Sequence, residues 1–91
     1  RNMENAKWNK LTIRPLNDEE KEYYKDSKID SMWDGNQPEI DEEVLVWTPR
    51  SVGVYTDTWT DDSDYGVGFE YTDDTVIYWT SFPKPPKVGK K

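Results

Sequence analysis

The side chains of this sequence that could take part in chemistry are mainly carboxylates. The chain contains 19 Asp and Glu residues but neither His nor Cys. The absence of His removes the usual general base near neutral pH. Together with the absence of Cys, it excludes the Ser-His-Asp and Cys-His arrangements and any thiolate zinc site. Any catalysis would therefore have to rest on carboxylates.

A pair of carboxylates could perform the acid–base chemistry of glycoside hydrolysis. The candidates are Asp57, Glu70, Asp73 and Asp74. Such a pair needs a deep sugar-binding cleft, and a chain of 91 residues leaves little material for one. We therefore expect that the protein is not an enzyme.

The acidic run Asp61-Asp62-Ser63-Asp64 could hold a hard cation through its carboxylate oxygens. Its spacing does not fit a calcium loop of the EF-hand type. Position 12 counted from Asp61 is Thr72, and position 6 counted from Asp62 is Val67 instead of Gly. The sequence favours a solvated hairpin loop here, and it predicts neither a metal site nor a cofactor.

The net charge of −7 is unevenly distributed along the chain. Residues 15–83 hold eighteen acidic and four basic side chains, whereas residues 1–14 and 84–91 are both net basic. An acidic middle disfavours direct binding to nucleic acid, which requires basic residues to displace counterions. It suits a basic protein partner, although charges that merely solvate a small domain explain it as well.

Aromatic residues among these acids could form a recognition surface, because Trp and Tyr are enriched in binding hot spots. Packing in the core is the alternative explanation for most of them; those nearest the acidic loops, Trp59 and Tyr65, are the best surface candidates. Acids around exposed rings could imitate the phosphates and bases of nucleic acid and occupy a basic channel in a partner. The predicted partner-binding residues are Asp57, Trp59, Asp61, Asp62, Asp64, Tyr65, Asp73 and Asp74.

A run of β-branched and aromatic residues predicts a strand over residues 75–82. Large apolar side chains fall on both of its faces, which indicates an interior strand covered on both sides. Ile77, Tyr78 and Trp79 are expected in the core.

Further strands are predicted over residues 44–48, 52–60 and 67–71, with short connections that favour antiparallel pairing. Residues 7–14 look like a short strand or extended arm. Asn17 and Glu20 form a capping-box pattern that predicts a helix over residues 18–25, with Tyr23 or Tyr24 directed to the core. Residues 26–38 are expected to be mostly loop.

These elements predict an α+β fold: a small antiparallel β-meander of three to four strands, with the N-terminal arm and one short helix packed on one face. We expect a single domain over residues 1–91, with residues 1–6 and 84–91 as flexible tails. The Pro-x-x-Pro pattern at residues 83–87 is expected to be a tail that ends the last strand. No apolar run approaches the roughly 18 residues of a membrane span, so a cytoplasmic protein is the expectation.

The order of several short motifs carries a resemblance to a known family. Trp8 precedes the step Arg14-Pro15-Leu16, Pro38 precedes the strand Glu42-Glu43-Val44-Leu45-Val46, and the run Val76 to Pro83 follows. Over roughly residues 7–86 the chain resembles small phage and prophage proteins that share a domain of unknown function. Members often end in Trp-Met-Pro-Leu-Pro, whereas this chain has Thr80-Ser81-Phe82 in place of Met-Pro-Leu.

The resemblance implies an accessory phage product and transfers no catalytic residue. Small acidic phage proteins are often inhibitors of host defence nucleases. The expectation is a non-enzymatic protein of the host bacterial cytoplasm that inhibits a host protein with a basic nucleic-acid-binding surface, such as a CRISPR or restriction nuclease. The alternative is a structural or assembly module that self-associates through a sheet edge. The sequence leaves the oligomeric state open.

Overall fold

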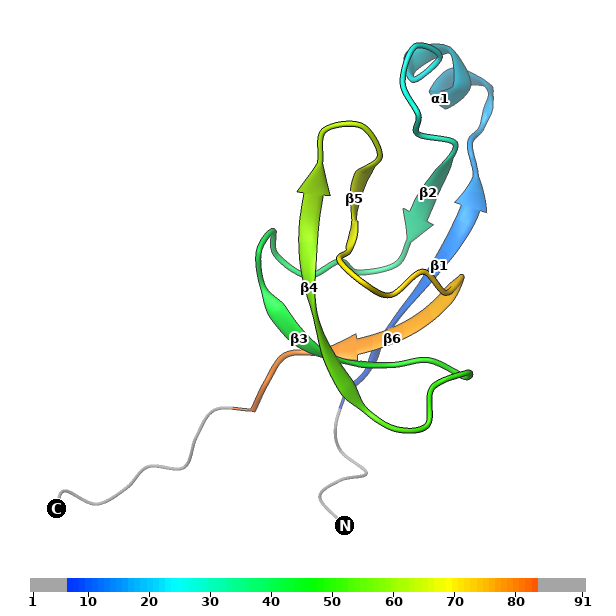
Figure 1. The fold of residues 1–91 in the computed structure, drawn as a ribbon. Coiled ribbons are helices and arrows are strands. Elements are labelled where there is room, and N and C mark those ends of the chain that lie inside the picture. Colours follow the sequence, from blue (N-terminus) through cyan, green and yellow to red (C-terminus); the bar gives the residue numbers. More distant parts are fainter. Residues whose placement is uncertain (1–6, 84–91) are drawn as a thin grey trace, which may run out of the picture.

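Six strands form one antiparallel sheet that curls into a half-barrel (Figure 1). The computed structural model describes residues 7–83. In chain order the elements are β1 (Asn9–Pro15), α1 (Asp18–Tyr23), β2 (Ser31–Asp34), β3 (Glu43–Trp47), β4 (Tyr55–Asp62), β5 (Gly66–Phe69) and β6 (Val76–Thr80). The protein is therefore mostly β.

The strand order is β2-β1-β6-β3-β4-β5, so β6 lies in the middle of the sheet between β1 and β3. Leu11 of β1 pairs with Ile77 of β6, and Val46 of β3 pairs with Trp79. The predicted antiparallel sheet is confirmed, and β3, β4 and β5 follow one another as a meander, but the sheet has six strands and β6 pairs with β1 and β3 instead of β5. The segment predicted as a short strand or extended arm over residues 7–14 contains most of β1. This strand belongs to the sheet, because its backbone pairs with β6 on one side and with β2 on the other.

The core fills the concave side of the half-barrel. Its buried members are Leu11, Val44, Val46, Trp59, Phe69, Ile77 and Trp79. Trp59 makes edge-to-face contacts with Phe69 and with Trp33, whose ring centroids lie 4.9 and 5.5 Å away. Every described strand except β2 contributes a buried side chain, and β2 contributes the partly buried Trp33.

The last strand is interior, as predicted, but only one of its faces is covered. Ile77 and Trp79 are buried, whereas Val76, Tyr78 and Thr80 are partly exposed on the convex face. Tyr78 is therefore not a core residue. On that face its ring packs against Trp47 of β3, with centroids 5.7 Å apart.

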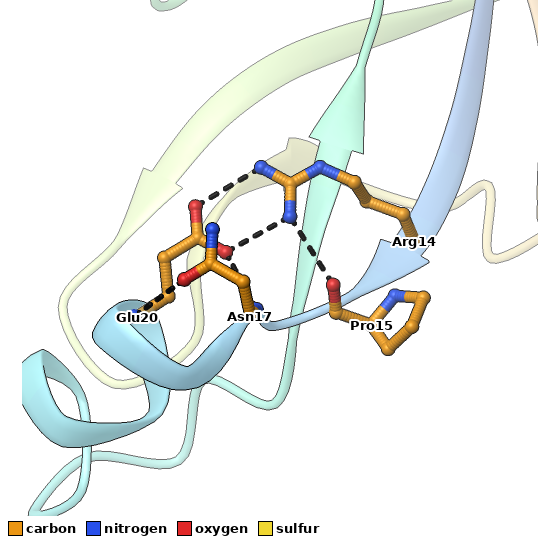
Figure 2. A network of polar contacts seen from close by, with 4 residues as sticks. All are labelled: Arg14, Pro15, Asn17 and Glu20. Atoms are coloured by element: carbon orange, nitrogen blue, oxygen red, sulfur yellow. Dashed lines mark hydrogen bonds and ion pairs between the residues drawn. The ribbon is translucent and has the colours of Figure 1, made fainter.

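The helix begins where the sequence predicts but does not pack on the sheet. Asn17 Oδ1 accepts a hydrogen bond from Glu20 N at 2.8 Å, and Glu20 Oε1 accepts one from Asn17 N at 3.0 Å. Arg14 binds both carboxylate oxygens of Glu20 (Figure 2). The helix buries no residue, and Tyr23 is 81% exposed. It lies beyond the ends of β1 and β2 (Figure 1), so no sheet face is within its reach.

Strand β2 falls within the segment that was expected to be loop. It has only four residues, and it forms because its backbone pairs with β1, with Trp33 opposite Ile13 and Asp34 opposite Thr12. Gly35 follows it with φ 122°, a conformation open to glycine, and a Cβ there would collide with the carbonyl oxygen of Lys10. Strand β2 thus forms because of its pairing with β1, and its own sequence pattern does not predict it. The predicted tails at residues 1–6 and 84–91 lie outside the described residues.

Candidate functional site

Asp57, predicted to be on the partner-binding surface, is buried. It retains only 4% exposure, because the alternation along β4 directs it to the concave side. Its carboxylate accepts hydrogen bonds from the backbone N–H groups of Thr58, Tyr71 and Thr72, and from Thr72 Oγ1 at 2.7 Å. The carboxylate is therefore satisfied within the chain and cannot contact a partner.

The hydrogen bonds of Asp57 fix the connection between β5 and β6. Thr72 Oγ1 also lies 2.7 Å from the hydroxyl of Tyr55, which ties the same connection to the start of β4. The next two residues, Asp73 and Asp74, therefore emerge from a held backbone. Asp57 therefore affects the surface indirectly, through the backbone that it holds next to Asp73 and Asp74.

Trp59, the other expected aromatic anchor, is also a core residue. It is 1% exposed and packs between Trp33 and Phe69. Asp57 and Trp59 are two residues apart on β4, so their side chains lie on the same, inward face. The prediction that Trp59 lies on the partner-binding surface is therefore wrong.

The hairpin between β4 and β5 is ordered by one of its own acids. The Oδ1 atom of Asp62 accepts hydrogen bonds from Asp64 N at 2.7 Å and from Tyr65 N at 3.1 Å. Gly66, with φ 85°, then starts β5. The outcome is a turn that leaves Tyr65 62% exposed. Asp61, Asp62 and Asp64 are exposed as well.

A groove of about 560 Å³ lies between this hairpin and the segment from α1 to β2. We call it the acidic groove. Its acids are Asp30, Asp61, Asp73 and Asp74, and its apolar and aromatic lining comes from Ile13, Tyr24, Ile29, Met32, Trp33, Tyr65 and Val67. Four of the eight predicted partner-binding residues, Asp61, Tyr65, Asp73 and Asp74, thus come together in one place.

The acidic groove carries a surplus of negative charge. Its lining has four aspartates and one lysine, Lys28. Within residues 7–83, the carboxylates of Asp30, Asp61 and Asp73 take part in no ion pair or side-chain hydrogen bond. Asp74 Oδ2 has only a long contact of 3.8 Å with Arg50 Nε. Most of this charge is therefore available to a cation from outside.

Trp33 forms the wall of the groove that joins its two sides. Its Nε1–H donates a hydrogen bond to the carbonyl oxygen of Val67 at 2.9 Å. This bond ties the edge strand β2 to the opposite edge strand β5 across the open side of the half-barrel. Figure 1 shows these two strands next to each other. Trp33, Lys28 and Asp30 were not predicted as site residues. Their segment was expected to be mostly loop, and among these three residues only the large aromatic side chain of Trp33 sets it apart from an ordinary polar loop.

The arrangement can receive cationic and apolar groups. Among residues 7–83, no group of three or more Asp or Glu side chains is placed to hold a metal ion. Within the same range, no helix has the length and apolar character needed to cross a membrane.

Comparison of the chain with protein-family models, with curated protein sequences and with solved structures gave no match.

Proposed function

We propose that this chain is a non-enzymatic phage protein that binds and inhibits a host protein through the acidic groove. The partner we have in mind is a nucleic-acid-directed defence enzyme with a basic surface. One observation carries the proposal: Asp61, Tyr65, Asp73 and Asp74, distant from Asp30 in sequence, line one groove with it. Within residues 7–83, three of the four aspartates in this set have no ion pair, and Asp74 has only the long contact with Arg50.

The charge of the groove decides the kind of partner. Carboxylates held on a fixed backbone repel the phosphates of nucleic acid and attract the lysines and arginines that bind them. Asp73 and Asp74 follow directly on the backbone held by Asp57, so they need little ordering when a partner binds. The groove therefore resembles in charge the nucleic acid that such a partner would otherwise hold.

Exposed aromatic and aliphatic groups supply the second part of the proposed contact. Tyr65 is 62% exposed and lines the groove together with the acids, and the partly exposed Ile29 and Val67 belong to the same lining. Tyrosine contributes large contact area at small entropic cost. The predicted acids Asp62 and Asp64 sit on the same hairpin, outside the groove, where they add to its negative rim.

The test is an affinity capture from a bacterial lysate with three forms of the protein. The groove variant carries Asp61→Asn, Asp73→Asn and Asp74→Asn. The control carries Glu19→Gln, Glu39→Gln and Glu43→Gln, which remove the same charge from exposed residues outside the groove. We expect the wild-type protein and the control to retain a common protein that binds duplex DNA, and the groove variant to lose it.

An exposed ion pair contributes roughly 0.2–1 kcal/mol, so the loss of three should weaken binding by about tenfold. Equal retention by all three forms, or a retained protein without affinity for nucleic acid, contradicts the proposal.

A further inference from the structure

A lysine of the chain lies in the acidic groove against an aromatic ring. The Nζ atom of Lys28 is 5.5 Å from the centroid of the Tyr65 ring. Both residues line the groove, one from the segment after α1 and one from the β4–β5 hairpin. This distance is within the range of a cation–π interaction.

No carboxylate holds this ammonium group at close range. Among the ion pairs of residues 7–83, none includes Lys28, although four aspartates line the same groove. The ring of Tyr65 is therefore its main attachment. Since Lys28 is exposed on a long flexible side chain, this attachment can be exchanged for water or for another contact.

The groove offers more attraction for a cation than its own lysine uses. With four aspartates and Lys28, the lining keeps a net charge of −3. An aromatic face beside carboxylates is the combination that attracts lysine and arginine side chains, through the ring quadrupole and through charge-assisted hydrogen bonds. The volume of about 560 Å³ lies within the range of ordinary ligand pockets.

We propose that the Tyr65 side of the acidic groove is a subsite for one lysine or arginine side chain of a protein partner. Lys28 occupies this subsite in the free protein and leaves it when the partner binds. The inference rests on the proposed function and adds the chemistry of the group that enters. The occupant is a side chain of a protein because the groove is open and its rim continues onto the exposed acids Asp62 and Asp64.

The convex face of the sheet supplies a matched control. There the Nζ atom of Lys10 lies 5.9 Å from the centroid of the Tyr78 ring, and Tyr78 pairs with Lys10 and Trp47 across three strands. Neither Lys10 nor Tyr78 lines the acidic groove. A change at Lys10 therefore alters the net charge of the protein as much as a change at Lys28, without altering the groove.

The test uses three tripeptides with blocked ends, Gly-Lys-Gly, Gly-Arg-Gly and Gly-norleucine-Gly, titrated into the full chain at low salt. Binding is followed by the NMR signals of the Tyr65 ring and the Trp33 indole N–H, both in the groove. We expect the Lys and Arg peptides to shift these signals with saturation. The norleucine peptide, which has the hydrocarbon chain of lysine without the terminal ammonium group, should bind at least about tenfold more weakly.

Variants separate the subsite from a general effect of charge. Lys28→Gln should raise the affinity for the Lys peptide by about threefold or more. Lys10→Gln should change this affinity by less than about 1.5-fold. Tyr65→Phe should retain binding and Tyr65→Leu should weaken it, because only the first keeps the ring face. Unfolding curves check that each variant is folded.

Equal binding of the norleucine and lysine peptides overturns the inference, and so does an equal gain from Lys28→Gln and Lys10→Gln. These outcomes leave the proposed function standing if the lysate capture still depends on Asp61, Asp73 and Asp74. If that dependence is also missing, both fall.

Discussion

Asp57 is a buried carboxylate whose hydrogen bonds hold the backbone that leads to two acids of the groove. It accepts bonds from Thr58 N, Tyr71 N, Thr72 N and Thr72 Oγ1, which compensate for the loss of its hydration. Asp73 and Asp74 follow directly in the chain. A residue outside the groove thus positions two of its four carboxylates.

Asp57→Asn is expected to destabilise the protein. The amide keeps the size of the side chain but places an NH₂ group where an oxygen accepts hydrogen bonds from Thr72 or Tyr71. We expect a loss of about 2–3 kcal/mol in the free energy of unfolding, the usual scale for hydrogen bonds to a charged group. Urea denaturation measures it, with the exposed Asp61→Asn as a control that should stay within about 0.5 kcal/mol of wild type. Equal stability of the two variants contradicts the structural role of Asp57.

Glu20 provides a prediction about pH. The hydrogen bond from the Arg14 guanidinium, followed by that from the Asn17 backbone, lowers the pKa of Glu20 from 4.5 to about 2 (Figure 2). Because the folded pKa is depressed, the stabilisation of the start of α1 is fully present above about pH 4.5 and is lost as the pH falls through about 2. Solvent screening keeps its effect on overall stability small.

A carbon-13 NMR titration of the Glu20 carboxyl group tests this shift. In the Arg14→Gln variant the pKa should move back toward 4.5, because the largest cause of the shift is removed. Identical titration curves for Glu20 in the two proteins would show that Arg14 does not hold it.

At the scale of elements, β6 and β2 decide the shape of the sheet. β6 pairs with β1 on one side and with β3 on the other, so the backbone pairing of the sheet is continuous only through this strand. β2 carries Trp33 to the open side, where it bonds to Val67. One element holds the sheet together and the other builds the wall of the groove.

Trp79→Ala tests the central position of β6. Trp79 is 7% exposed and its Nε1–H donates to Asn36 O at 2.9 Å. Its truncation leaves a cavity and an unpaired carbonyl, and should cost about 3–5 kcal/mol of unfolding free energy. Phe82→Ala, at a position 47% exposed, should cost much less. A cooperatively folded Trp79→Ala protein as stable as Phe82→Ala would refute the placement.

Gly35→Ala tests the turn that ends β2. A Cβ at Gly35 would meet the Lys10 carbonyl oxygen, and φ is 122°. We expect a loss of about 1–3 kcal/mol, the scale of backbone strain at such a position, and a weakened contact of Trp33 with β5. Gly53→Ala is the control, because nothing lies within 4 Å of its Cβ position. Thermal unfolding compares the two, and equal midpoints would show that the turn tolerates a side chain.

At the scale of the whole molecule, local patterns predicted some elements and tertiary pairing determined the rest. Runs of β-branched and aromatic residues located β3, β4, β5 and β6, and the capping pattern at Asn17 located the start of α1. Strand β2 was missed because four residues carry too little periodicity, and its pairing with β1 is not local. The position of β6 between β1 and β3 leaves no local signal either.

The candidate site was predicted to about the same extent. Asp61, Tyr65, Asp73 and Asp74 were named because acids and rings cluster in two stretches of the sequence, and the fold brings those stretches together. Asp57 and Trp59 were misassigned because alternation defines two faces without saying which one is buried. Lys28 and Asp30 join the groove only through the position of β2.

The central claim is that the acidic groove competes with nucleic acid for a basic surface. The most direct measurement is the displacement of labelled duplex DNA from the captured partner, followed by fluorescence anisotropy. The wild-type protein and the Glu19/Glu39/Glu43→Gln control should displace the DNA at similar concentrations. The Asp61/Asp73/Asp74→Asn variant should need about tenfold more, with a smaller dependence on salt. Displacement at the same concentration by all three, or by none, would contradict the claim.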